Sequence, residues 1–87
     1  MKVINTSNAP AAIGPYSQAI EVNGMVYTSG QLPINPTTGE FAGSDIKSQA
    51  EQSLKNVKAI LEEAGIGMQN VVKTTVFLAD MADFAAM

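Results

Sequence analysis

The dipeptide Asn23-Gly24 constrains the fold of this chain more than any other feature. It separates two β-prone runs, SQAIEV at residues 17–22 and MVYTSG at residues 25–30. A two-residue Asn-Gly loop between such runs is the strongest short-range signal for a type I′ β-hairpin. The sequence therefore predicts that residues 17–22 pair antiparallel with residues 25–30.

The two-residue loop also fixes which residues face each other across the ribbon. It predicts three cross-strand pairs: Val22 with Met25, Ile20 with Tyr27, and Gln18 with Ser29. One further step along the ladder places Tyr16 beside Gln31. The turn alone is thus expected to carry a tyrosine next to the Ser-Gly-Gln segment at the open end of the hairpin.

Side-chain alternation sorts the hairpin residues into two faces. The larger apolar residues share one face, which we expect to pack under a helix: Ile20, Val22, Met25 and Tyr27. The other face carries small groups: Ser17, Ala19, Val26, Thr28 and Gly30. Small side chains allow close approach of another layer, so this second face is expected either to meet solvent or to meet another subunit.

The next segment, LPINPTTGE, is rich in turn residues, and a long amphipathic helix is predicted after it. Ser44 is a suitable N-cap with Asp45 in the first turn, and Gly65 is a suitable C′ residue. Between these signals, apolar residues recur at spacings of three and four: Ile46, Ala50, Leu54, Val57, Leu61 and Ala64. This stripe is expected to lie on the sheet.

Two further elements are predicted near the C-terminal end. The β-branched run VVKTTVFL at residues 71–78 is typical of a central strand. Asp80 is then a suitable N-cap for a helix that begins in MADFAAM. The expected fold class is α/β (α+β), an N-terminal portion with the element order ββαβα of a ββαβαβ domain that lacks its last strands.

Composition excludes several classes of function. The 87 residues contain no cysteine, histidine or arginine, and the five basic residues are lysines in a chain of net charge −3. We therefore expect no metal site, no disulfide and no nucleic-acid partner, and chemistry built from hydroxyls, amides, backbone groups and carboxylates. No run has the length of a membrane span and the first ten residues lack a signal-peptide core, so a cytoplasmic protein without a membrane partner is expected.

Four stretches, in this order, resemble the Rid family, also called YjgF: NAPAAIGPYSQAI, VYTSGQLPINPTTGE, QAEQSLKNVKAILEEAG and VVKTTVFLADMADFAAM. The resemblance covers essentially residues 1–87, as a single Rid-like domain that is C-terminally incomplete. It implies a chorismate-mutase-like protomer, a homotrimer with ligand clefts between protomers, and hydrolysis of reactive 2-imino acids such as 2-iminobutanoate and 2-aminoacrylate-derived imines. The products are 2-keto acids and ammonia, and no cofactor takes part.

The resemblance also implies the site residues. Tyr16 matches the family's site tyrosine, so it is the candidate catalytic residue, and Ser29, Gly30 and Gln31 are the candidate substrate-binding residues. The family's carboxylate-binding arginine and late glutamate have no counterpart among the 87 residues, so the chain is expected to carry about half of a site and to be inactive alone.

Blander interpretations stand beside these. Taken alone, Tyr16 would be a packing tyrosine, Ser29 and Gln31 would be polar residues at a strand end, and Gly30 would be a turn or bulge glycine. Two function classes remain: an imine deaminase, and a non-catalytic ligand-binding or translation-inhibitor-like member of the same family or an inactive fragment of one.

Overall fold

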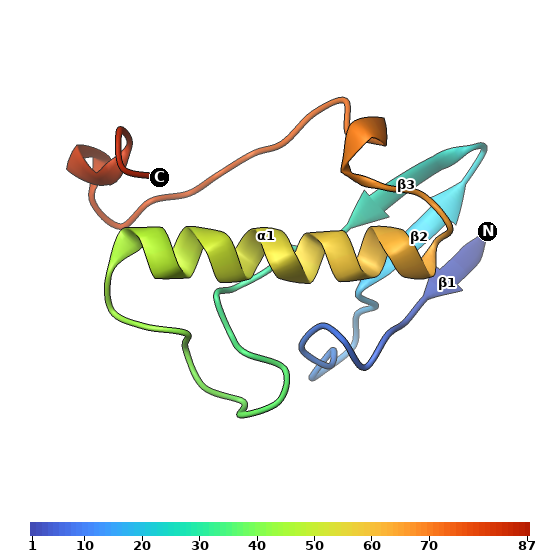
Figure 1. Cartoon of the computed structure of the whole chain (residues 1–87). Helices are drawn as coiled ribbons and strands as arrows, with labels where there is room; N and C mark the ends of the chain where they lie inside the picture. The colour runs from blue at the N-terminus through green and yellow to red at the C-terminus, as the bar shows by residue number, and fades with distance from the viewer.

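The computed structural model describes all residues from Met1 to Met87. The strands are β1 (Lys2–Ile4), β2 (Ala19–Val22) and β3 (Met25–Thr28), followed by the helix α1 (Ile46–Glu63) and two short 3₁₀ helices, η1 (Met68–Asn70) and η2 (Met81–Asp83). One antiparallel sheet with the order β1-β2-β3 lies beside one long helix (Figure 1). The predicted α/β class is confirmed, although the element order differs from ββαβα. The single long helix, α1, is not apolar enough to cross a membrane.

The hairpin β2–β3 forms as the Asn-Gly turn predicts. Asn23 and Gly24 both have positive φ, 50° and 77°, as a type I′ turn requires. Val22 lies opposite Met25, which confirms the predicted register, and Ile20 is paired with Tyr27 in the same way. At the open end of the hairpin the regular strands are shorter than predicted, since β2 begins at Ala19 and β3 ends at Thr28. One more backbone hydrogen bond, from Ser29 N–H to the Gln18 carbonyl at 2.9 Å, extends the pairing.

The strand β1 was not among the predicted elements. It pairs antiparallel with β2, so that Val3 lies opposite Ile20 and Ile4 opposite Ala19. With only three residues it carries too short a pattern to be recognised in the sequence. Ile4 is nonetheless buried in the core.

The predicted helix is confirmed, with its N-cap one residue later than expected. Asp45 is the cap instead of Ser44, and one of its carboxylate oxygens accepts a hydrogen bond of 3.0 Å from Ser48 N–H. This backbone bond is the main cause that holds the pKa of Asp45 below its ordinary value of 3.8.

The C-terminal end of α1 follows the prediction. Gly65 has a φ of 84°, a left-handed conformation that glycine adopts without strain. Its N–H donates to the Glu62 carbonyl and the N–H of Ile66 donates to the Leu61 carbonyl, both at 3.0 Å. These two bonds form a Schellman motif that satisfies the last helical carbonyls.

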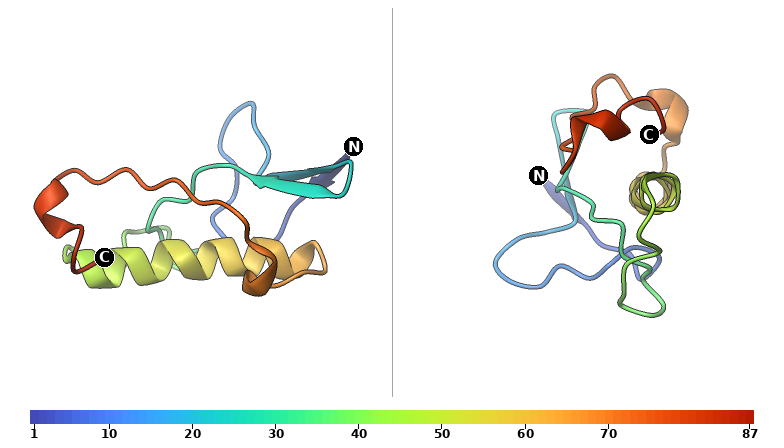
Figure 2. Two further views of the ribbon diagram at one scale, coloured as in Figure 1. Left: turned by 90° about the horizontal axis from the view of Figure 1, so that it is seen from above. Right: turned by 90° about the vertical axis from the view of Figure 1, so that its left-hand side faces the viewer.

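The helix covers the opposite face of the sheet from the one predicted. Ala19 is buried together with Ile4, Ala9 and Ile60, and Val26 packs against this cluster. The small side chains of this face let α1 approach closely, and Figure 2 shows the helix along one side of the sheet only. The larger apolar residues therefore face away from α1, and Tyr27 is 59% exposed.

The buried line of α1 is also shifted from the predicted stripe. Asn56, Ile60 and Leu61 are its buried residues, whereas Leu54 is exposed. Periodicity finds apolar residues only, so the predicted stripe did not include Asn56, which is fully buried. Only eight of the 87 residues are buried, so each of these contacts is a large part of the core.

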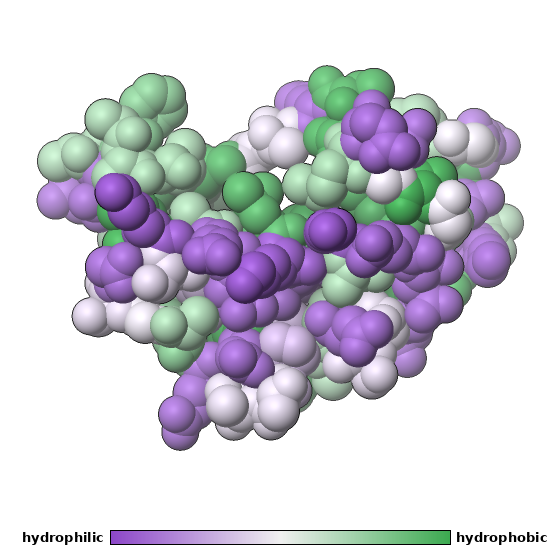
Figure 3. All heavy atoms as spheres, in the orientation of Figure 1, coloured by the Kyte–Doolittle hydropathy of each residue, from purple (hydrophilic) through white to green (hydrophobic).

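Residues 71–78 do not form the predicted central strand. After η1 they run extended along the length of α1, in the direction opposite to the helix, and no strand of the sheet pairs with them (Figure 1). A β-strand exists by hydrogen bonding to a neighbouring strand, and β propensity alone cannot supply that neighbour. Four of their five apolar side chains, those of Val71, Val72, Val76 and Phe77, are exposed, Phe77 by 93%. Green apolar atoms accordingly gather in the upper part of Figure 3, above the hydrophilic outer side of α1.

The predicted C-terminal helix is reduced to the 3₁₀ turn η2. Asp80 caps it as predicted, since its carboxylate accepts a 2.9 Å bond from Ala82 N–H. Met81 and Phe84 are exposed, so the expected apolar stripe is not buried within this chain.

Candidate functional site

A depression of about 410 Å³ lies at the open end of the hairpin, and three of the four predicted site residues line it. They are Tyr16, Gly30 and Gln31. The ribbon between them is 14 residues long with a two-residue turn, which is why residues from before β2 and after β3 meet at one place. Tyr16 is 53% exposed, so its phenol is accessible from solvent.

Local turns hold this end of the hairpin. Gly14 has a φ of 112°, and the N–H of Tyr16 donates to the Gly14 carbonyl at 2.9 Å. On the other side the Gln31 side-chain amide donates to the Ser29 carbonyl at 3.2 Å. The phenol and the Gln31 carboxamide are thus presented by short hydrogen-bonded turns on the two sides of the ribbon.

Ser29 has a different place from the other three residues. Its Oγ donates a 2.6 Å hydrogen bond to the Ser17 carbonyl, and it is not among the residues that line the depression. This bond crosses from one side of the hairpin to the other beyond the last regular pair. In this structure the Ser29 hydroxyl therefore joins the two sides of the hairpin at its open end.

Gly30 lies in open surroundings. A Cβ at this position would meet no atom within 4 Å, and its φ is outside the left-handed region. The chain itself therefore has no steric or conformational need for glycine here. What its missing side chain leaves free is space at the depression.

The rest of the lining comes from two loops without regular structure. One loop contributes Pro10, Ala11 and Ile13, and the other contributes Leu32, Ile34, Asn35, Pro36 and Gly39. None of the lining residues is charged. The depression can offer a phenol, three carboxamides and backbone groups, but it holds no cation for a carboxylate.

Two buried carboxamides fasten these loops, and the sequence analysis missed both. Gln18, which also lines the depression, is hydrogen bonded to the backbone at Thr6, Ala9 and Pro10. Asn56 on α1 donates to the carbonyls of Leu32 and Ile34. An available signal was the presence of an asparagine two turns inside an otherwise regular helix, four residues before Ile60.

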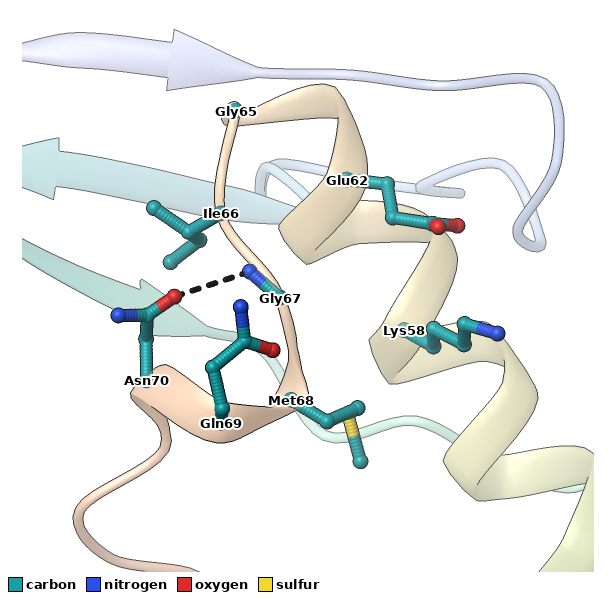
Figure 4. A pocket seen from close by; sticks show the side chains of 8 residues that line it. All are labelled: Lys58, Glu62, Gly65, Ile66, Gly67, Met68, Gln69 and Asn70. Carbon is teal, nitrogen blue, oxygen red and sulfur yellow. Dashed lines mark hydrogen bonds between the residues drawn. The ribbon is translucent and has the colours of Figure 1, made fainter.

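A second depression, of about 550 Å³, lies at the C-terminal end of α1 (Figure 4). Lys58 and Glu62 on the helix border it, and the turn after the helix completes it. The one side-chain hydrogen bond between its lining residues is a turn bond, from Gly67 N–H to the Asn70 side-chain oxygen at 3.1 Å. No predicted site residue lies there, and Figure 4 shows the Lys58 and Glu62 side chains pointing away from the turn. Nowhere in the chain do three histidine, cysteine, aspartate or glutamate side chains gather as metal ligands would.

Comparison with known proteins gives close matches over nearly the whole chain. The family described as Endoribonuclease L-PSP matches residues 6–87. A RutC family protein of Pasteurella multocida is 62% identical over 86 residues, and a 2-iminobutanoate/2-iminopropanoate deaminase of Escherichia coli K12 is 56% identical. Both alignments cover 99% of this chain and 66% of the relative, so the chain spans about two thirds of the length of the curated relatives it matches.

The fold is similar to solved structures to the same extent. The crystal structure of Escherichia coli TdcF with bound serine superposes with a TM-score of 0.93 at 49% identity, covering 98% of this chain and 66% of that one. Sequence and fold therefore agree, and the resemblance noted from the motifs is confirmed. The chain belongs to the Endoribonuclease L-PSP family, which is the family known as Rid or YjgF.

Proposed function

We propose that the whole protein hydrolyses reactive 2-imino acids, such as 2-iminobutanoate, to 2-keto acids and ammonia. The observation that carries the proposal is the depression in which Tyr16 meets Gly30 and Gln31. It is supported by the 56% identity over 86 residues to a 2-iminobutanoate/2-iminopropanoate deaminase. The substrate site proposed is the open end of the hairpin.

The reaction needs little covalent help from a protein. Water adds to the carbon of the N-protonated imine, and one proton of that water moves to the nitrogen. The C–N bond then breaks, and the remaining hydroxyl proton passes to the departing ammonia, which leaves the keto acid and ammonium. Placing the water and the imine and moving one proton supply large rate factors. In this proposal the Tyr16 hydroxyl orients the water, and the Gly30 backbone and Gln31 carboxamide position the substrate.

The carboxylate of the substrate needs a partner that these 87 residues do not provide. The lining of the depression is uncharged and the sequence contains no arginine. An arginine guanidinium is the side chain that holds a carboxylate through two parallel hydrogen bonds. We therefore propose that the segments present in the longer relatives supply this group, and that residues 1–87 alone have near-background activity.

The assembly proposed is a homotrimer with clefts between protomers, as the family resemblance implies. The exposed apolar face of the sheet is the surface that supports self-association: Val3, Ile20, Val22, Met25 and Tyr27. An exposed apolar patch of this kind is typical of an interface. The face that was expected from sequence to meet another subunit is the one occupied by α1.

A non-catalytic ligand-binding member is the second candidate. The TdcF structure contains bound serine, an amino acid that shares the α-carboxylate of a 2-imino acid. A neutral depression that lacks its own cation is also compatible with simple binding. The two candidates differ in whether an imine is consumed.

The test follows the loss of 2-iminobutanoate, generated in situ from threonine by a dehydratase. Three samples are compared: the protein at its full encoded length, its Tyr16→Phe variant, and residues 1–87. The full protein should accelerate imine loss, and Tyr16→Phe should reduce turnover by about 1 to 3 kcal/mol of activation free energy, the value of one lost hydrogen bond.

Tyr27→Phe is the matched control, because it removes the other tyrosine hydroxyl of the chain, on the outer sheet face, and should leave turnover unchanged. An inactive full-length protein that still binds serine would favour the binding candidate.

A further inference from the structure

We infer that Gln18 and Asn56 are positioning residues that set the shape of the depression at Tyr16, an inference that rests on the proposed function for its kinetic part. Both side chains are carboxamides and both are fully enclosed, with exposures of 1% and 0%. Neither is expected to touch the reacting atoms. They act through the two loops that complete the lining.

Gln18 holds the first loop with all of its hydrogen-bonding groups. Its Oε1 accepts from Thr6 N–H at 2.7 Å, and its Nε2 donates to the carbonyls of Thr6 at 3.0 Å, Ala9 at 3.3 Å and Pro10 at 2.8 Å. The oxygen faces a donor and the nitrogen faces only acceptors, so the orientation of the amide is fixed by its surroundings. Pro10 is itself part of the lining.

Asn56 holds the second loop from the helix side. Its Nδ2 donates to the Leu32 carbonyl at 3.1 Å and to the Ile34 carbonyl at 3.0 Å, while its Oδ1 accepts from Gln52 Nε2 at 2.9 Å. Leu32 and Ile34 both line the depression. The side chain thus fixes this part of the lining relative to α1, which in turn is fixed to the sheet.

Neither loop has a regular strand to hold it. No strand or helix occurs within residues 5–18 or residues 29–45. In the view of Figure 1 both loops lie below α1. Backbone carbonyls in such loops are usually satisfied by water, and a loop satisfied that way has many alternative shapes. A buried carboxamide that meets two or three carbonyls at once selects one shape. This is the physical role we assign to each side chain.

The first experiment needs no variant and no activity. In the full-length parent, the amide proton of Thr6 should exchange with solvent as slowly as amides within β2, although Thr6 lies outside every strand, because Gln18 Oε1 accepts from it. The two Nδ2 protons of Asn56 should likewise be slow, since both are donated to backbone carbonyls from a fully enclosed side chain. Exchange of either group at the rate of neighbouring exposed loop amides would overturn the inference for that residue.

The second experiment measures imine hydrolysis by full-length Gln18→Met and Asn56→Leu variants. Each change replaces the carboxamide by an apolar side chain of similar size and so removes the bonds to the loop. KM should rise about tenfold or more, because a misplacement near 1 Å already has large effects on a positioned reaction. The control is Gly65→Ala, which strains the turn after α1 at a φ of 84° and adds a Cβ that meets no atom within 4 Å, so it should lower Tm with unchanged KM.

The outcomes separate the inference from the proposed function. Folded variants with lower Tm and unchanged KM would overturn the positioning role and leave a merely structural one. A full-length parent without imine hydrolysis would remove the proposed function, and hydrogen exchange would then decide the inference alone. Should a variant fail to fold, the exchange measurement on the parent decides it in the same way.

Discussion

Replacing Gly30 by alanine tests whether residue 30 is glycine because the fold requires it or because a ligand needs the space. A Cβ at residue 30 meets no atom within 4 Å and the backbone is outside the left-handed region. Alanine restricts the unfolded chain, so at such a position Gly→Ala stabilises by about 0.4 to 1 kcal/mol. The fold should therefore gain slightly while the added methyl group occupies space at the depression.

Gly24 is the matched comparison. It also has open space around it, but its φ is 77°. An L-residue in the left-handed region costs about 1 to 2 kcal/mol, so Gly24→Ala should destabilise by that amount. The two Gly→Ala variants should thus differ in stability by about 1.5 to 3 kcal/mol, with opposite signs relative to the parent.

The assay combines urea unfolding with imine hydrolysis, both on the full-length protein at one fixed protomer concentration. Gly30→Ala should unfold at a urea concentration equal to or higher than that of the parent. Its kcat/KM should be lower than that of the parent by about tenfold or more. Gly24→Ala should unfold earlier and keep its kcat/KM per folded protomer. The reasoning is refuted if Gly30→Ala is as destabilised as Gly24→Ala, or if it is stable and fully active.

Three other changes test separate parts of the structure. Asp45→Ala should lower Tm at neutral pH by removing the helix cap. Because folding lowers the pKa of Asp45, the stability that this carboxylate contributes is fully present above its ordinary pKa of 3.8 and is lost as the pH falls through the lower folded pKa. The Tm values of parent and variant should therefore converge in acid. Tyr27→Lys should shift the proposed trimer of the full-length protein toward monomer in light scattering, since it puts a charge in the exposed apolar sheet face; an unchanged mass would argue against that interface. Gly65→Ala should lower Tm through strain at a φ of 84°, and Gly65→Asn should lower it less, because asparagine tolerates that region better.

Local signals in the sequence predicted the local parts of the fold well. The Asn23-Gly24 turn fixes a register, and Gly65 fixes a helix end, because each depends on the backbone of two or three residues. The meeting of Tyr16 with Gln31 followed from that register. The family motif then gave these residues a role that their chemistry alone would not have given.

The failures concern contacts between elements. Alternation shows that Ala19 and Tyr27 lie on opposite faces but not which face the helix takes, and the rule that larger apolar residues are covered first gave the wrong answer. The run at 71–78 has strand propensity but no neighbouring strand. Gln18 and Asn56 were missed because a polar residue becomes a core residue only through the particular carbonyls that it meets.

The loop that follows Leu32 closes on itself. Ile34 and Phe41 form an isolated β-bridge at its base, Asn35 N–H donates to the Glu40 carbonyl at 2.8 Å, and Gly39 N–H donates to the Asn35 carbonyl at 2.8 Å. Residues inserted or deleted between residues 36 and 39 would therefore leave the bridge, α1 and the hairpin in place. In contrast, inserting or deleting one residue in the Asn23-Gly24 turn would shift the strand register and move every side chain of one strand to the other face of the sheet. Since Pro36 and Gly39 border the depression, this loop is the place where a protein of this fold can change the length of its pocket without refolding its scaffold.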